Sequence, residues 1–276
     1  MRTALLAAAL AAASLAGGAH AAQRPALPDW TGIWETDSRH GTLFDDATAE
    51  PPTANGQGLQ DRIRPPYNAE YEARYEKVLA QHRAGIAADP LTSCIPAGYP
   101  RMLSLPYQHE FVVRPEGVWH ITEYDHLVRR IYTDGRKQPT ADQLWPMWNG
   151  HSVGHWEGDT LVVEAISMRG DTPFDRSESP HSEKLRIEER WRKVDPTHIE
   201  VKLVLTDPVA FTRPWLVTRR FRKVTEVIDG GPPRIDDIYQ CGESQRNPVV
   251  NGQTQTLLKD DPPGYVQGAF PDAPKP

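Results

Sequence analysis

The sequence predicts an all-β protein: an antiparallel up-and-down barrel of about eight strands, with an N-terminal arm that contains one helix. Two observations lead to this prediction. Between residues 109 and 225, apolar and polar side chains alternate with a period of two, as they do along strands with one buried face. Most of these runs are joined by short turn sequences, which favour sequential antiparallel neighbours. Closure into a barrel removes the unpaired sheet edges; an open sandwich is the alternative.

Residues 1–21 have the pattern of a secretory signal peptide. Arg2 precedes an apolar run, and an Ala-His-Ala sequence ends at Ala21. The run is shorter than the ~20 residues that a membrane span requires. We therefore expect cleavage after Ala21, export to the periplasm or the medium, and no transmembrane segment.

The composition restricts the class of partner. The net charge is −6 and no basic block is present, so we expect no nucleic-acid partner. Cys94 and Cys241 are the two cysteines, and in an oxidising compartment such a pair predicts one disulfide. Two free thiols are the alternative. The oligomeric state is not predicted.

The predicted arm covers residues 22–108. Its helix is expected at 69–84, where Asn68 has the residue type of an N-cap and Gly85 ends the pattern. The apolar stripe of this helix comprises Tyr71, Tyr75, Val78, Leu79 and His82. The sequence "WTGIWETDS" earlier in the arm is a candidate short strand.

The barrel is expected over residues 109–225, followed by a proline-rich tail, 226–276, that wraps around it. Turn sequences such as Glu157-Gly158 separate the strands. The eight predicted strands are 110–114, 118–124, 127–133, 151–156, 160–167, 184–194, 198–206 and 215–224.

The sequence "PDWTGIWE" ahead of this run of strands resembles the entry to lipocalin and calycin barrels, where a Gly-x-Trp motif lies at the barrel base. Gly32-Ile33-Trp34 is the matching motif. The resemblance implies a barrel, although the helical insert after the motif departs from the usual spacing. The segments "CIPAGYPR", "GHSVGHWEGDTLVVE", "SPHSEKLRIEERW" and "LTDPVAFTRPW" are similar to a family of secreted bacterial proteins that has no assigned activity. This second resemblance implies no function.

A carboxylate on an apolar strand face is the first sign of a site. In "KLRIEERWRKV", Glu189 shares the apolar face with Leu185, Ile187 and Trp191. An unpaired buried carboxylate costs several kcal/mol, so Glu189 requires a partner or a function. The expected register places Arg219 at the level of Leu203 and Glu189, which predicts a buried Glu189–Arg219 pair.

Two further pairs of polar residues lie near apolar faces. Glu123 and Arg130 are expected as inward-facing diagonal neighbours beside Tyr132, although the opposite face is nearly as apolar. His151 is expected opposite Glu164, or diagonal to it on the same face. A His–Glu hydrogen bond would orient the imidazole for general-base chemistry. The outward orientation of His151 is the alternative.

Other site classes are disfavoured. On a strand the spacing of His151 and His155 places their Cα atoms ~13 Å apart, so no metal site is expected. The sequence "GHSVGH" lacks the strand–turn–helix context of a serine nucleophile. Glycine-rich phosphate loops are absent, so no organic cofactor is expected.

The sequence thus predicts an exported protein with a small-molecule ligand or substrate in its barrel. The leading hypothesis is a cofactor-independent lyase, isomerase or hydrolase that uses acid/base chemistry. Its predicted catalytic residues are Glu189, His151, Glu164 and Arg219, and its predicted substrate-binding residues are Glu123, Arg130, Trp191, Trp215 and Tyr132. The alternative is a non-catalytic binding protein for a small apolar or aromatic ligand.

Overall fold

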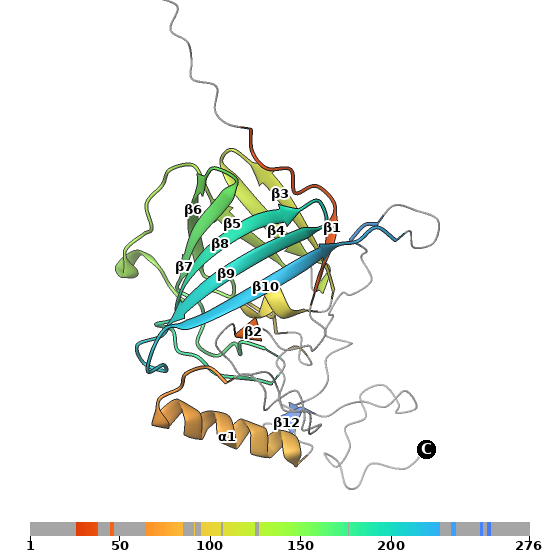
Figure 1. Cartoon of the computed structure of the whole chain (residues 1–276). Helices are drawn as coiled ribbons and strands as arrows, with labels where there is room; N and C mark the ends of the chain where they lie inside the picture. The colour runs from red at the N-terminus through yellow and green to blue at the C-terminus, as the bar shows by residue number, and fades with distance from the viewer. Residues whose placement is uncertain are drawn as a thin grey trace, which may run out of the picture.

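The protein is a closed β-barrel with one helix at one end of it (Figure 1). The computed structural model describes residues 26–37, 45–46, 64–84, 91, 95–105, 107–124, 127–175, 177–226, 233–235, 249–250 and 253–254. The predicted signal peptide, both cysteines and most of the predicted C-terminal tail lie outside the described residues, so export and the disulfide stay predictions.

Nine strands, β1 and β3 to β10, form the barrel, and β1 closes it by pairing with both β3 and β10. The predicted closed barrel is confirmed, with the short strand of the arm as its ninth member. A tenth strand, β2 (Asp45–Asp46), adds to β10, and β11 (Val249–Val250) pairs with β12 (Gln253–Thr254) as a separate hairpin. The barrel strands are β1 (Ile33–Thr36), β3 (Gln108–Arg114), β4 (Gly117–Thr122), β5 (Val128–Tyr132), β6 (His151–Glu157), β7 (Thr160–Ile166), β8 (Arg186–Asp195), β9 (His198–Thr206) and β10 (Trp215–Lys223).

One connection differs from the predicted up-and-down order. Strands β5 and β6 pair in parallel, with Ile131 opposite Ser152 and Tyr132 opposite Val153. Parallel neighbours require a crossover of a dozen residues or more. Residues 133–150, which include the 3₁₀ turn η5 (Ala141–Gln143), provide it.

Alternate residues of each strand face the interior, as the period of two predicts. On β8 the buried side chains are Ile187, Glu189 and Trp191. On β4 and β5 the predicted inward face is wrong. His120 and Thr122 on β4 point inward with Arg129 and Ile131 on β5, and Arg130 is exposed.

Helix α1 (Ala69–Arg83) agrees with the predicted helix to within one residue. The Asn68 side chain accepts a hydrogen bond from the Tyr71 amide at 3.0 Å, which satisfies a backbone donor of the first turn. Tyr75 and Leu79 are buried on the face of the helix that packs against the protein. The Tyr75 hydroxyl donates to Ser177 Oγ at 2.9 Å, which connects the helix to the loop after β7.

Side chains from η3, from the segment before β1 and from β1 itself fill the two ends of the barrel. The 3₁₀ turn η3 (Arg101–Ser104) places Met102 and Leu103 in the core, each fully buried. Trp30 and Trp34 are buried at the other end, and the Trp34 indole donates to the Trp30 carbonyl at 3.0 Å. The interior is thus an aromatic and aliphatic core that also contains charged groups.

None of the helices in the described part of the chain is long and apolar enough to cross a membrane.

Candidate functional site

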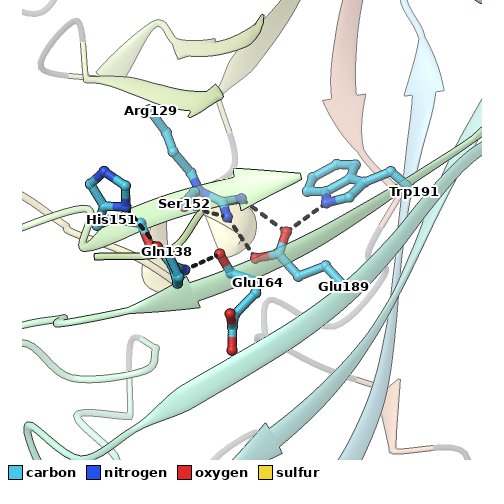
Figure 2. A network of polar contacts seen from close by, with 7 residues as sticks. All are labelled: Arg129, Gln138, His151, Ser152, Glu164, Glu189 and Trp191. Carbon is cyan, nitrogen blue, oxygen red and sulfur yellow. Dashed lines mark hydrogen bonds and ion pairs between the residues drawn. The ribbon is translucent and has the colours of Figure 1, made fainter. Parts of the chain in front are cut away.

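The predicted buried carboxylate is the centre of a polar network inside the barrel (Figure 2). Arg129 on β5 donates from Nη2 to Glu189 Oε1 at 2.6 Å and from Nη1 to Oε2 at 3.0 Å. The Trp191 indole donates to the same Oε2 at 2.6 Å. Arg129 also donates to Ser152 Oγ, from Nε at 3.1 Å and from Nη2 at 2.9 Å. Each side chain of this network is at most 1% exposed, so the charges of Arg129 and Glu189 compensate each other directly in the barrel interior.

The predicted partner of Glu189 is therefore wrong. The predicted pairing of Glu189 with Leu203 is correct, but β10 is displaced by two residues from its expected register, because Trp215 rather than Val217 lies opposite Leu205. Arg219 consequently lies opposite Val201, at the level of Trp191. Its Nε donates to the Leu103 carbonyl at 2.9 Å, which anchors η3 to the barrel wall.

The Arg129 guanidinium also stacks on an aromatic ring. Its Cζ lies 3.6 Å from the centre of the Tyr99 ring, a distance at which the ring quadrupole attracts the cation. Burial acts to lower the pKa of Arg129, but the adjacent Glu189 carboxylate and Tyr99 together outweigh this effect and raise it. Burial likewise raises the pKa of Tyr99 well above its ordinary value. Arg129 is therefore a permanent cation and Tyr99 a neutral phenol.

Two histidines lie side by side next to this network. His109 Nδ1 and His120 Nε2 are 2.9 Å apart, and His109 Nε2 is 3.4 Å from the Leu105 carbonyl. Both imidazoles are fully buried. Burial lowers the pKa of His109 to about 3, and burial together with His109 and Arg129 lowers the pKa of His120 well below its ordinary value. Both rings are therefore neutral near pH 7.

We use the term aromatic cluster for His120 and the aromatic rings that pack around it near the Trp30 end of the barrel. Ring centres of Phe111 and His120 are 4.4 Å apart and stacked, and Trp30 lies 5.8 Å from Phe111 and 5.5 Å from Trp156. Phe221 contacts Trp191 at 5.8 Å. The aromatic cluster comprises Trp30, Phe111, His120, Trp156, Trp191 and Phe221.

Three polar atoms of the aromatic cluster are buried and have no hydrogen-bond partner among the described residues. They are Nε1 of Trp30, Nε1 of Trp156 and Nδ1 of His120. Buried polar groups in native proteins are nearly always paired, so each exception requires an explanation. The two indole groups are donors.

His151 and Glu164 lie on the outer face of the barrel. The structure pairs His151 with Ile166 and Val153 with Glu164, which leaves the two side chains diagonal, the second register that the sequence allowed. Gln138 lies between them: its Oε1 is 2.8 Å from His151 Nδ1, and its Nε2 donates to the Glu164 carbonyl at 2.9 Å (Figure 2). The Glu164 carboxylate pairs with Arg186. The expected direct His–Glu contact is thus replaced by a bridging amide.

The remaining predicted binding residues are dispersed. Tyr132 stacks on His151 at 5.6 Å on the outer face. Glu123 is buried just after β4, where its Oε2 accepts from the Gln108 amide at 3.4 Å. Trp215 is inside the barrel but packs on Phe174 at 5.7 Å, near the helical end. Of the predicted set, the structure brings together Glu189 and Trp191 inside the barrel and Tyr132 and His151 on its outer face.

Sequence reasoning missed Arg129, Ser152, His109, His120 and Trp30. The alternation did contain a signal for some of them, because His120 and Arg129 belong to the second apolar face of their hairpin. Ser152 and Gly154 alternate on one face of β6, but small residues give a weak apolar pattern. Within the described residues, no three histidine, cysteine, aspartate or glutamate side chains are arranged to hold a metal ion.

Comparisons with known proteins do not assign a family. No protein-family model matches the chain, and no curated protein matches it. Among solved structures, the chain is similar to a secretary abundant heat soluble (SAHS) protein from Ramazzottius varieornatus, with 12% sequence identity over 71% of this chain and 95% of that chain. The TM-score is 0.30, which is too low to support an argument about fold or function. The assignment as a barrel therefore rests on the strand pairing.

Proposed function

We propose that this is an exported, non-catalytic binding protein that holds a small aromatic ligand against the aromatic cluster. The observation that carries the proposal is the pair of buried indole N–H groups, on Trp30 and Trp156, that lack an acceptor among the described residues. An unsatisfied buried donor costs about 1–3 kcal/mol. A ligand with an aromatic ring and an acceptor atom would pair with such a donor and stack on the surrounding rings.

The charges near the cluster favour a neutral ligand. Arg129 and Glu189 compensate each other, and burial keeps His109 and His120 uncharged near pH 7. A charged ligand would lose its hydration without gaining an unpaired counter-ion from these four side chains.

The hydrogen bonds of Glu189 support binding over acid/base catalysis. A general base must reach the proton that it removes. Both oxygens of Glu189 already accept hydrogen bonds, from Arg129 and Trp191. His151 and Glu164 face outward, away from the aromatic cluster. Acid/base roles for these residues stay predictions, and the interior geometry favours a binding role.

Entry of a ligand would require the segment 26–32, which carries Trp30, to move. Its main chain is held by the buried bond from the Trp34 indole to the Trp30 carbonyl and by two lysines at the barrel rim. Lys193 Nζ donates to the Asp29 carbonyl at 2.9 Å and Lys223 Nζ to the Thr31 carbonyl at 2.8 Å. The two lysine contacts are exposed and therefore weak relative to the barrel ladders. The other members of the aromatic cluster lie on barrel strands, whereas Trp30 precedes β1. We therefore expect this segment to open at lower cost than the strands do.

A titration with N-phenyl-1-naphthylamine, a neutral aromatic fluorophore, tests the proposal. We expect its emission to rise and shift to the blue on saturable binding to the mature protein. Trp156→Leu should weaken binding about three- to tenfold, the value of an aromatic contact. Trp145→Leu is the matched control, because Trp145 is 70% exposed. Absence of saturable binding, or equal effects of the two substitutions, would overturn the proposal.

A further inference from the structure

We propose that the ligand is a hydroxylated aromatic molecule, and that His120 selects it by accepting a hydrogen bond from its hydroxyl group at Nδ1. This inference rests on the proposed binding function and assigns the chemical class of the ligand. It depends on the tautomer of His120, which the neighbouring groups determine.

The tautomer follows from a chain of hydrogen bonds that begins at a backbone carbonyl. The Leu105 carbonyl can only accept, so His109 Nε2, 3.4 Å away, carries the proton of that ring. A neutral imidazole carries only one N–H proton, so the other nitrogen of this ring, His109 Nδ1, is unprotonated and accepts a hydrogen bond. His120 Nε2, 2.9 Å from this atom, must therefore donate. A neutral His120 that is protonated at Nε2 has a bare acceptor at Nδ1.

This acceptor is buried and has no donor among the described residues. His120 is 0% exposed, and Nδ1 lacks a hydrogen-bond partner. The cation Arg129 lies opposite His120 across the β4–β5 ladder. The guanidinium of Arg129 is directed to Glu189 and Ser152 instead.

The environment of His120 selects an aromatic donor. The imidazole stacks on Phe111 with ring centres 4.4 Å apart, and its ring centre is 5.9 Å from that of Trp191. A ligand next to Nδ1 therefore contacts ring faces and edges. Trp30 and Trp156 supply N–H donors in the same cluster, so a ligand that donates to His120 and also carries an acceptor suits the site best. A hydroxyl does both, whereas an ether only accepts.

The test compares two probes that differ in this one group, 2-naphthol and 2-methoxynaphthalene, by isothermal titration calorimetry at neutral pH. We expect the wild-type protein to bind 2-naphthol about tenfold more tightly, the factor that one hydrogen bond to a buried unpaired acceptor is worth. His120→Phe retains an aromatic ring but removes the acceptor, so it should bring the two dissociation constants together. His155→Phe is the matched control, because the His155 side chain is 66% exposed, and it should keep the wild-type ratio.

The outcomes separate this inference from the proposed function. If neither probe binds the wild-type protein, the proposed function fails. If both bind with equal affinity, or the ether binds more tightly, the role of His120 fails while the binding function stands. If His120→Phe does not fold, ¹⁵N NMR of the wild-type imidazoles replaces it. We then expect a bare Nδ1 on His120 whose ¹⁵N shift moves with 2-naphthol and not with the ether, and a protonated Nδ1 would overturn the inference.

Discussion

Arg129 and Glu189 form a two-point ion pair inside the barrel, with N–O distances of 2.6 and 3.0 Å, although 60 residues separate them in the chain. They lie on different strands, β5 and β8, and meet in the interior (Figure 2). Because the pair is buried, each charge depends on the other for compensation more than it would at the protein surface. Removal of either one leaves the other as an uncompensated charge in the core.

The first prediction concerns Glu189→Gln. This substitution leaves the buried Arg129 guanidinium without a counter-ion and should lower the free energy of unfolding by about 3–5 kcal/mol. Urea denaturation at neutral pH measures the change. Glu188→Gln is the matched control on the same strand, because the Glu188 side chain is 65% exposed and its substitution should cost less than about 0.5 kcal/mol. A Glu189→Gln protein as stable as the wild type would show that the pair is not a structural requirement.

The second prediction distinguishes the two interior arginines. A double-mutant cycle of Glu189→Gln with Arg129→Met should give a coupling energy of about 2 kcal/mol or more, because the two side chains share two hydrogen bonds. The matching cycle with Arg219→Met should give a smaller value, because Arg219 Nε donates to Leu103 instead. The same denaturation assay measures both cycles. A larger coupling for Arg219 would contradict the observed register of β10.

The third prediction is a loss of stability on mild acidification. The pKa of His109 falls from its ordinary 6.5 to about 3 in the folded protein. Between these values the unfolded chain binds a proton that the folded chain does not, so the free energy of unfolding decreases as the pH falls. The slope for His109 approaches about 1.4 kcal/mol per pH unit well below pH 6.5. His120, whose pKa is lowered too, acts in the same direction.

Urea denaturation at pH 7, 6 and 5 measures this slope. His120→Phe should make it shallower because one buried imidazole is removed, whereas His155→Phe, at an exposed position, should leave it unchanged. Stability that is constant from pH 7 to pH 5 would mean that the two buried imidazoles are protonated as easily as in the unfolded chain.

The fourth prediction concerns the glycine of the Gly-x-Trp motif. Gly32 has φ +122°, and a Cβ there would lie 2.5 Å from Lys223 Cε. Gly32→Ala strains the backbone and displaces the lysine that holds Thr31, so it should cost about 2 kcal/mol. Gly158→Ala, in the turn between β6 and β7, has φ +63° and open space around the added methyl. It should cost about 1 kcal/mol, and thermal or urea unfolding of both variants compares them. Equal costs would show that the backbone conformation of Gly32 and its contact with Lys223 together add nothing to the cost of an ordinary turn glycine.

The strands and the helix could be predicted because local side-chain patterns determine them. The eight expected strands match β3 to β10 to within a few residues at each end, and the helix matches α1. The closing strand β1 was harder to place. Its four residues carry little alternation, and it joins the barrel through partners on β3 and β10 that are distant in the chain.

The candidate site was predicted only in part. The apolar neighbours of Glu189 showed that it is buried, since alternation on β8 is strict. The identification of its partner depended on which face of the β4–β5 hairpin points inward, and the two faces are nearly equally apolar. In the structure, the face that carries His120 and Arg129 lies in the interior. The displacement of β10 by two residues then moved Arg219 away from Glu189 while its side chain stayed inward.

The sequence by itself determined the class of fold, the helix and the burial of a carboxylate at Glu189, because these follow from periodicity and from the cost of an unpaired charge. Only the tertiary structure decided which arginine compensates that charge and which histidines lie beside it. The physical reason is that the alternation of side chains divides the residues of a strand between two faces. It does not determine which of the two faces points into the barrel. Barrel closure and the registers of distant strands orient them, and those depend on contacts between segments far apart in the chain.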